Sequence, residues 1–432
     1  MIWGPKVVLR LACGRCPCVL RNGQILFLCA LALLTLGVLM VTSAGMQIEQ
    51  ASAEQPIRGD GGLSPIAILS GRIGIYAALA IGAMAVAAFA PASIVDRVIR
   101  PRPHRFYQML GVGALVLVGS LLLVYLPGIA REKNFSARWI EVPAPVLGRV
   151  SIQPSEFVKW SLLGLFAWCA VSAGDRLRLF WLGLVPMLIV LGMVSAVIMK
   201  EDLGTAVLVG STGIIILLAA GAKIWHIGVL APVGLGVVAA GLFTSEYRMK
   251  RVTSFVDPYA DPAGDGFHII QSMGAIANGE GVGRGLGHGL QKFGYLPEDT
   301  TDFIFAIISE ELGLFGVALV LFLYCVLLTT GSDIAKREQR PVARLFILGV
   351  IATIGLQACI NLLVVTKLAP TKGIALPLIS SGGTGWILTS AALGLIIRFD
   401  RSQLRGATDP AELTDKAEAE TDPPSEPVGA LA

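Results

Sequence analysis

The chain has 432 residues, of which 54% are hydrophobic and only 15% are charged, and its formal net charge is +4. This balance lies far outside the range of soluble globular proteins, so it excludes a soluble domain and predicts a polytopic membrane protein. Lysines and arginines in such proteins mostly report membrane topology, and we expect no nucleic-acid partner.

Ten apolar stretches are long enough, or nearly so, to cross a bilayer as helices. The sequence therefore predicts an all-α polytopic integral membrane protein of about ten transmembrane helices, with a large extracytoplasmic loop between spans seven and eight. The stretches lie near residues 25–43, 73–95, 106–126, 157–173, 179–199, 205–222, 227–243, 303–329, 345–366 and 386–398.

Basic residues in the short loops predict the orientation, because they favour the cytoplasmic side. With ten spans, all five basic clusters fall on one side, which puts both termini in the cytoplasm. The chain then divides into a cytoplasmic N-terminal segment (1–24), a membrane domain (25–400, with the outer loop at 244–302) and a cytoplasmic tail (401–432). The tail is acidic and poor in apolar residues, so we expect it to be disordered.

Three cysteines, Cys13, Cys16 and Cys18, stand together before the first span. A metal site there would lack a fourth ligand and a nearby histidine, so thiol lipidation or no role is the preferred interpretation.

Further basic residues occur on the opposite side, where the topology rule disfavours them. Singly, each is most simply a solvated loop charge, but the whole set indicates an anionic ligand. The set comprises Arg131, Lys133, Arg138, Arg149, Arg248, Lys250, Arg251, Arg284, Lys292, Lys367 and Lys372.

The fourth span begins with a motif that contains two ionisable residues, Glu156 and Lys159. Pro154 suits the first turn of a helix, so Glu156 and Lys159 would share a face and could pair. A helix cap with a snorkelling lysine is the alternative, and their position in the membrane favours a site. Asp202, in a short turn before Gly204 and Thr205, reads as an N-cap with a supporting role.

The large outer loop contains glycines at alternate positions from Gly279 to Gly289, with Arg284 between them. Their backbone N–H groups could bind an anion, or the glycines could simply give flexibility. The loop ends at Asp302, which is either an N-cap of the next span or a general base at the membrane surface. Glu310 and Glu311 lie about two turns deeper and must face the interior of the helix bundle.

Eight motifs of this chain occur together in one order: Arg138–Ile140, Gln153–Lys159, Asp202–Thr205, Arg251–Pro258, Gln291–Glu298, Thr301–Ala306, Glu310–Gly313 and Pro370–Ser380. As a set they resemble the SEDS proteins of bacterial wall synthesis over nearly all of residues 25–400. Within that family the resemblance is greater to the division branch than to the elongation branch.

The resemblance implies a peptidoglycan glycosyltransferase that polymerises lipid II at the outer face of the cytoplasmic membrane, at the division septum. It implies a catalytic role for Asp302, a class B penicillin-binding protein and other divisome proteins as partners, and a possible divalent cation, Mg or Mn. We assign substrate binding to Glu156, Lys159, Arg138, Arg251, Arg284, Lys292, Lys372 and Ser380, and supporting roles to Gln153, Asp202, Glu298, Glu310 and Glu311.

Some positions depart from the family pattern, which affects substrate detail and partner docking more than the reaction. Thr300 stands where the family has His, and Lys200–Glu201 where it has Gln-Pro. The Ser380–Gly385 motif and the length of the first outer loop also differ. Two alternatives stay open, a lipid II flippase and a scaffold that has lost catalysis, and an elongation role is the alternative to division.

Overall fold

The computed structural model describes residues 20–51, 71–126, 130–133, 136–144, 148–291, 300–381 and 383–407. The predicted site residues Lys292 and Glu298, the three N-terminal cysteines and residues 408–432 of the tail lie outside the described residues.

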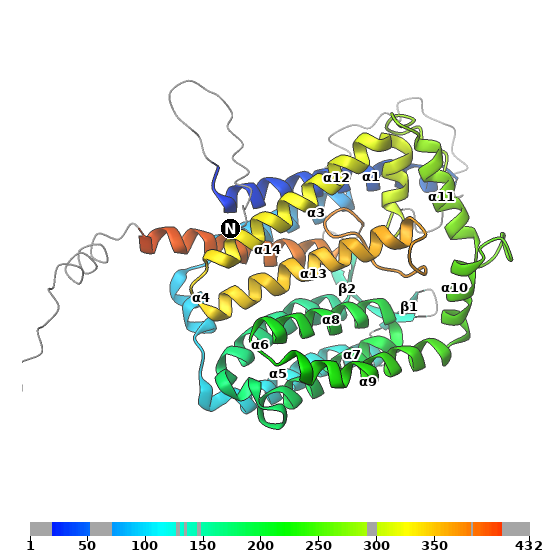
Figure 1. The fold of residues 1–432 in the computed structure, drawn as a ribbon. Helices are drawn as coiled ribbons and strands as arrows, with labels where there is room; N and C mark the ends of the chain where they lie inside the picture. Colours follow the sequence, from blue (N-terminus) through cyan, green and yellow to red (C-terminus); the bar gives the residue numbers. More distant parts are fainter. Residues whose placement is uncertain are drawn as a thin grey trace, which may run out of the picture.

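The described chain is mostly helical, as predicted (Figure 1). The helices are α1 (Asn22–Ala51), α3 (Arg72–Ala88), α4 (Ala92–Ile99), α5 (Phe106–Leu122), α6 (Pro154–Ala173), α7 (Val185–Glu201), α8 (Leu203–Ala219), α9 (Ile224–Phe243), α10 (Glu246–Val256), α11 (Phe267–Gly279), α12 (Ile304–Arg337), α13 (Pro341–Val365) and α14 (Thr384–Ala407). Single short turns of 3₁₀ or π type are η1 (Pro103–Arg105), η2 (Leu123–Tyr125), η3 (Gly174–Arg178) and η4 (Phe180–Leu184).

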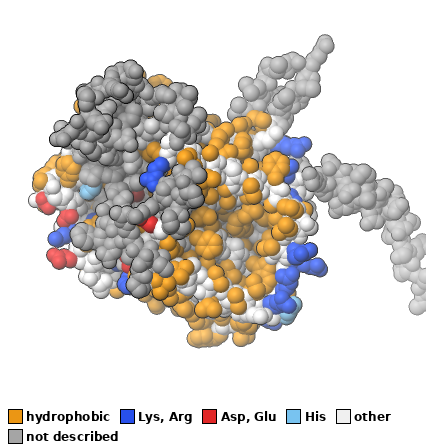
Figure 2. Space-filling model, turned by 180° about the vertical axis from the view of Figure 1, so that it is seen from behind, with side chains coloured by type: hydrophobic (Ala, Val, Ile, Leu, Met, Phe, Trp, Pro, Cys, Tyr) orange, Lys and Arg blue, Asp and Glu red, His pale blue; other side chains and the backbone are white. Residues whose placement is uncertain are grey.

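The ten apolar stretches coincide with helices, although stretch 73–95 covers two of them, α3 and α4. The protein is a multi-pass membrane protein. Seven helices among the described residues are long and apolar enough to cross a membrane, or eight if α3 and α4, which are bent by 80° at their junction, form one span. Helix α8 has only 17 residues, and α14 carries charged residues in its second half. The count of ten therefore stays a prediction. On the face shown in Figure 2, hydrophobic side chains form a broad continuous area, as lipid contact requires.

Helix α14 continues to Ala407, past the predicted start of the tail at residue 401. Arg398 and Arg401 donate hydrogen bonds to the carbonyls of Ala90 and Ala88 at the end of α3, at 2.7 and 3.3 Å. The first residues of segment 401–432 are thus helical, and Arg401 holds the start of the segment against α3.

The link between α5 and α6 forms a small sheet that the sequence analysis did not predict. Strands β1 (Ala130–Lys133), β2 (Ser136–Ala144) and β3 (Gly148–Ile152) pair in the order β1-β2-β3, all antiparallel. In this register Trp139 faces Arg131, and Ile140 faces Ile152. The sheet leads directly into α6, whose first residue is Pro154. It also supplies Arg138 to the site described below.

The large loop between α9 and α12 is partly helical, since it contains α10 and α11. Ala275 of α11 is fully buried, and the hydroxyl of Ser272 donates to the carbonyl of Val365 at 2.9 Å. The loop therefore folds against the bundle.

Helix α12 is broken near its start. Gly313 has φ = 60°, a left-handed conformation that side chains disfavour, and it divides a short helical part before it from the long span after it. The short part, residues 304–312, is almost entirely buried.

The segment between α13 and α14, residues 366–383, folds back into the bundle. Leu376 and Ile379 are 1% and 0% exposed. The segment reaches α1 at Gly37, where a Cβ would lie 2.7 Å from the carbonyl oxygen of Ile379. The absence of a side chain at Gly37 lets this returning segment lie against α1.

Candidate active site

Glu156 and Lys159 form the predicted ion pair at the start of α6. Their charged atoms are 2.8 Å apart, and the side chain of Lys159 is only 2% exposed. The Lys159 ammonium also donates to Oε1 of Gln357 on α13 at 3.1 Å. Lys159 therefore does not snorkel to the surface. A buried ammonium with a carboxylate partner supports the site interpretation over the cap alone.

Gln357 and Asn361, one turn apart on α13, connect this pair to the returning segment. Gln357 donates to the carbonyl of Ala375 at 2.8 Å. Asn361 donates to the carbonyls of Ile374 at 2.7 Å and of Asp302 at 2.8 Å. Two amide side chains thus fix both the returning segment and the backbone of Asp302.

Asp302 lies just before α12, whose N-cap position is Phe303. The N-cap interpretation therefore does not describe its position. The Asp302 carboxylate lies beside Gly373, where a Cβ would come within 3.0 Å of Oδ2. The side chain is partly exposed. It thus sits at the edge of the bundle, in contact with the motif that contains Lys372 and Gly373.

Lys372 is half-buried between cationic and anionic neighbours. Burial lowers the pKa of its ammonium, and the Arg248 guanidinium lowers it further, while the Asp202 carboxylate raises it. Arg251 on α10 donates to the carbonyl of Thr371 at 3.5 Å, so α10 brings a second cation to this segment. Lys372, Arg248 and Arg251 therefore lie around one segment.

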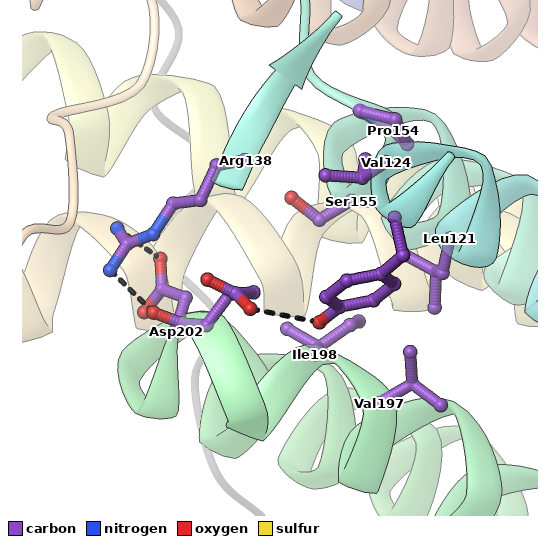
Figure 3. Close-up of a pocket in the computed structure, with 10 residues that line it drawn as sticks. Leu121, Val124, Arg138, Pro154, Ser155, Val197, Ile198 and Asp202 are labelled. Atoms are coloured by element: carbon purple, nitrogen blue, oxygen red, sulfur yellow. Dashed lines mark hydrogen bonds and ion pairs between the residues drawn. The ribbon is translucent and has the colours of Figure 1, made fainter. Parts of the chain in front are cut away.

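Asp202 caps α8, as predicted, by accepting from the backbone N–H of Thr205 at 3.0 Å. It also pairs with Arg138 from strand β2 at 3.3 Å. A pocket opens beside this pair (Figure 3). Ser155, next to Glu156, is part of its wall, and Tyr125 donates to the carboxylate of Glu201 at 2.9 Å. The pocket thus connects Arg138 and Asp202 to the start of α6.

Glu310 and Glu311 are 0% and 1% exposed, which confirms that they face the interior. Glu310 accepts from the backbone N–H groups of Leu290 at 2.9 Å and Gln291 at 3.2 Å. Glu311 accepts from the N–H of Gly287 at 3.1 Å and from the hydroxyl of Ser43 at 3.0 Å. The glycine-rich segment does bind anions through its backbone, as one interpretation predicted, but these anions belong to the same chain.

Three further assigned residues are Arg284, Ser380 and Gln153. Arg284 lies away from Asp302, whereas Ser381, next to Ser380, donates to the carbonyl of Thr300 at 2.9 Å, two residues before Asp302. Arg284 is exposed beside the break in α12, and its backbone N–H donates to the carbonyl of Glu310 at 3.0 Å. The short helix between Glu310 and Asp302 spans roughly 13 Å, which keeps Arg284 away from Asp302. Ser380 is 1% exposed and accepts from the N–H of Leu376 at 2.7 Å, within its own turn. Gln153 precedes α6 without capping it by its side chain. These contacts of Arg284 and Ser380 are structural, and substrate binding by both residues stays a prediction.

The described part of the chain holds no group of three or more His, Cys, Asp or Glu side chains placed to bind a metal ion. The Asp302 carboxylate lies beside the backbone of Gly373 instead. The described residues therefore do not build a closed site for Mg or Mn.

Sequence reasoning missed Gln357 and Asn361. Both are amides inside an otherwise apolar span, four residues apart and so on one face of α13. Buried amides need hydrogen-bond partners, so this spacing was a usable signal.

Comparison with known proteins gives one family. A family model described as cell cycle protein, FTSW_RODA_SPOVE, matches residues 23–404. A probable peptidoglycan glycosyltransferase FtsW of Geobacter sulfurreducens is 35% identical over 389 residues, covering 90% of this chain and 97% of the relative. Stage V sporulation protein E of Bacillus subtilis is 40% identical over 282 residues, covering 65% of this chain and 76% of the relative.

Two solved structures share the fold. One, described as the structural coordination of polymerization and crosslinking by a peptidoglycan synthase complex, has a TM-score of 0.63 and 25% identity, and the match covers 88% of this chain and 97% of the other. The rod shape determining protein RodA of Thermus thermophilus has a TM-score of 0.54 and 22% identity, with 88% and 96% covered. The second likeness speaks for the fold alone.

Proposed function

Because the chain belongs to the cell cycle protein family of FtsW, RodA and SpoVE, we propose that it is a peptidoglycan glycosyltransferase that polymerises lipid II, and that it serves septal wall synthesis. The name of the Geobacter relative supports the transferase activity and the division role over flipping or elongation. The observation that carries the proposal is the connection of Asp302 to the Glu156–Lys159 pair through Asn361 and Gln357.

Asp302 is the general base. Its carboxylate takes the proton of the acceptor sugar hydroxyl as that oxygen forms a bond to the anomeric carbon of the donor. The bond from that carbon to the donor pyrophosphate breaks at the same time, and the pyrophosphate leaves as an anion. Asn361 positions the base by holding the Asp302 carbonyl at 2.8 Å. A base of this kind typically contributes about 10²–10⁴ in rate.

The cations near Asp302 stabilise the leaving pyrophosphate. Arg251 donates to the carbonyl of Thr371, next to Lys372, and Gly373 after it lies beside the Asp302 carboxylate. Positive charge placed where negative charge develops stabilises the transition state more than the ground state. Burial lowers the pKa of the Lys372 ammonium, and the nearby Arg248 guanidinium lowers it further against the opposing effect of the Asp202 carboxylate.

The working partner is a class B penicillin-binding protein. A structural neighbour comes from a complex that couples polymerization to crosslinking, and a polymerase that makes glycan strands needs a transpeptidase to crosslink them. We place Asp302, the outer loop and this partner on the extracytoplasmic side, with both termini in the cytoplasm.

The test compares Asp302→Asn with wild type for glycan polymer formed from labelled lipid II, with the transpeptidase present. Asn keeps the size of the side chain but cannot accept the proton, so we expect the rate to fall about 10²–10⁴-fold. Asp265→Asn is the matched control, because Asp265 lies on the same loop outside the site. Near-normal polymerisation by Asp302→Asn would remove the catalytic assignment.

A further inference from the structure

A second cavity lies at the end of the bundle opposite Asp302. It has a volume of about 300 Å³ and lies where α6 and α8 end and α13 begins. Its wall includes Asp175, Arg178, Ala220, Pro341 and Arg344. Helix α6 separates it from the candidate active site, since Glu156 is at the start of that helix and the cavity is at its end. The cavity is therefore a separate site.

Two arginines make this cavity electropositive. Neither Arg178 nor Arg344 has a side-chain hydrogen bond or ion pair within the part of the chain that the structure describes, and neither does Asp175. The α13 N-terminus adds about half a positive charge, and the ends of α6 and α8 each add about half a negative charge, so the helix ends together contribute about −0.5. The two full guanidinium charges outweigh the single carboxylate and the helix ends, so the cavity favours an anion with several oxygen acceptors, such as a phosphate.

The surroundings of the cavity match the headgroup layer of a membrane. Just after Arg178, Leu179 and Trp181 are 52% and 75% exposed, and Trp225, shortly after the end of α8, is 81% exposed. Exposed tryptophans collect at membrane interfaces. In Figure 2 basic side chains gather at one edge of the apolar surface. Basic pockets between the ends of transmembrane helices bind anionic lipid headgroups.

We propose that this cavity binds the phosphate of an anionic phospholipid from the adjoining leaflet, held by Arg178 and Arg344. The apolar surface beside Arg178 accommodates the acyl chains, which a soluble phosphate compound does not need. Binding joins the end of α6 to the start of α13. These two helices carry Lys159 and Gln357, which are hydrogen-bonded to each other. The bound lipid therefore stabilises the packing of α6 against α13, the two helices that carry Lys159 and Gln357.

The experiment uses the full-length protein in nanodiscs of phosphatidylcholine, with increasing phosphatidylglycerol. Native mass spectrometry measures the phosphatidylglycerol that stays bound, and the melting temperature measures its effect. The test variant carries Arg178→Gln and Arg344→Gln. The control variant carries Arg97→Gln and Arg105→Gln, which removes the same charge from exposed positions outside the cavity.

We expect phosphatidylglycerol to raise the melting temperature of wild type and control equally, and its affinity for the test variant to fall about 30-fold. Unchanged binding by the test variant, or an equal loss in the control, would overturn the site. Equal protection by inorganic phosphate alone would overturn the assignment to a lipid, and equal protection by pure phosphatidylcholine would overturn the anion preference.

Discussion

Single side chains in this protein are held by polar contacts deep between apolar helices. The ammonium of Lys159 is shared by Glu156 and Gln357, and Asn361 bridges two carbonyls. Buried polar groups of this kind lose much of their free energy of hydration, so each must keep its partners. Removing one of these side chains therefore leaves a buried polar group of another without its hydrogen-bond partner.

Glu156 and Lys159 are expected to act as a unit. Glu156→Gln leaves the Lys159 charge buried without a carboxylate, and Lys159→Met leaves Glu156 without its cation, so each single change should reduce polymerisation about as much as both together. The measurement is a double-mutant cycle on polymer formation. Asp333 and Lys336, an exposed pair at 3.2 Å, give the matched cycle, for which we expect almost no effect. Additive losses at Glu156 and Lys159 would contradict the prediction.

Lys372 is expected to lower the stability of the fold while it supports glycan polymerisation. Burial and Arg248 lower the pKa of the Lys372 ammonium in the folded state. Below this folded-state pKa the charged ammonium therefore destabilises the fold. The destabilisation disappears as the pH rises from the folded-state pKa toward the unfolded-state pKa of about 10.4. Lys372→Met should therefore raise the melting temperature at pH 7 while it lowers polymerisation. The gain in melting temperature over wild type should shrink between pH 7 and 9.5. A lower melting temperature at pH 7 would show that the attraction to Asp202 dominates instead.

At the scale of elements, the broken helix α12 joins the active site to the outer loop. Its short first part begins just after Asp302 and ends at Glu310 and Glu311. The N–H groups of Arg284 and Gly285 donate to the carbonyls of these two glutamates at 3.0 and 2.9 Å. The loop thus binds both the carbonyls and the carboxylates at the break. We infer that the break at Gly313 positions the loop and, through the short helix, Asp302.

Gly313→Ala tests this inference. A Cβ at Gly313 would lie 2.3 Å from the backbone nitrogen of Gly283, at a φ of 60°. We expect a loss of about 1–3 kcal/mol in the free energy of unfolding and faster amide exchange over residues 283–291. Gly192→Ala on α7 is the control, since nothing lies within 4 Å of its Cβ position and alanine favours a helix. Unchanged exchange in Gly313→Ala would mean that the loop does not depend on the break.

At the scale of the whole molecule, the two ends of the bundle have different chemistry. One end holds Asp302, Lys372 and the outer loop, and the other holds the second cavity with Arg178 and Arg344. The first end faces outward in our proposal, where lipid-linked sugars are polymerised, and the second faces the cytoplasm, where basic residues are favoured.

This orientation is tested with single cysteines in a variant that lacks the seven native ones. A cysteine at Ala263, an exposed position in the loop between α10 and α11, should react with a membrane-impermeant reagent in intact spheroplasts. One at Lys336, exposed at the other end of α12, should react only after lysis. The reverse labelling pattern would show that the topology is opposite to the one proposed.

The sequence by itself determined the membrane class, the helices and the local pairing of Glu156 with Lys159. Apolar periodicity and a three-residue spacing are properties of adjacent residues, so no distant contact is needed to read them. The motifs Thr301–Ala306 and Pro370–Ser380 also indicated the family.

Only the tertiary structure decided which of these residues meet. It brought Gly373 to Asp302 and joined Asp302 to Lys159 through Gln357 and Asn361. In the tertiary structure, backbone N–H groups in and just after the glycine-rich segment donate to the carboxylates of Glu310 and Glu311. Arg284 lies away from Asp302. The residues between α5 and α6, which the sequence suggested only as a basic loop, form a sheet. These contacts join residues far apart in the chain. They depend on how the helices pack and on the need of every buried polar group for a partner, which spacing along one segment does not specify.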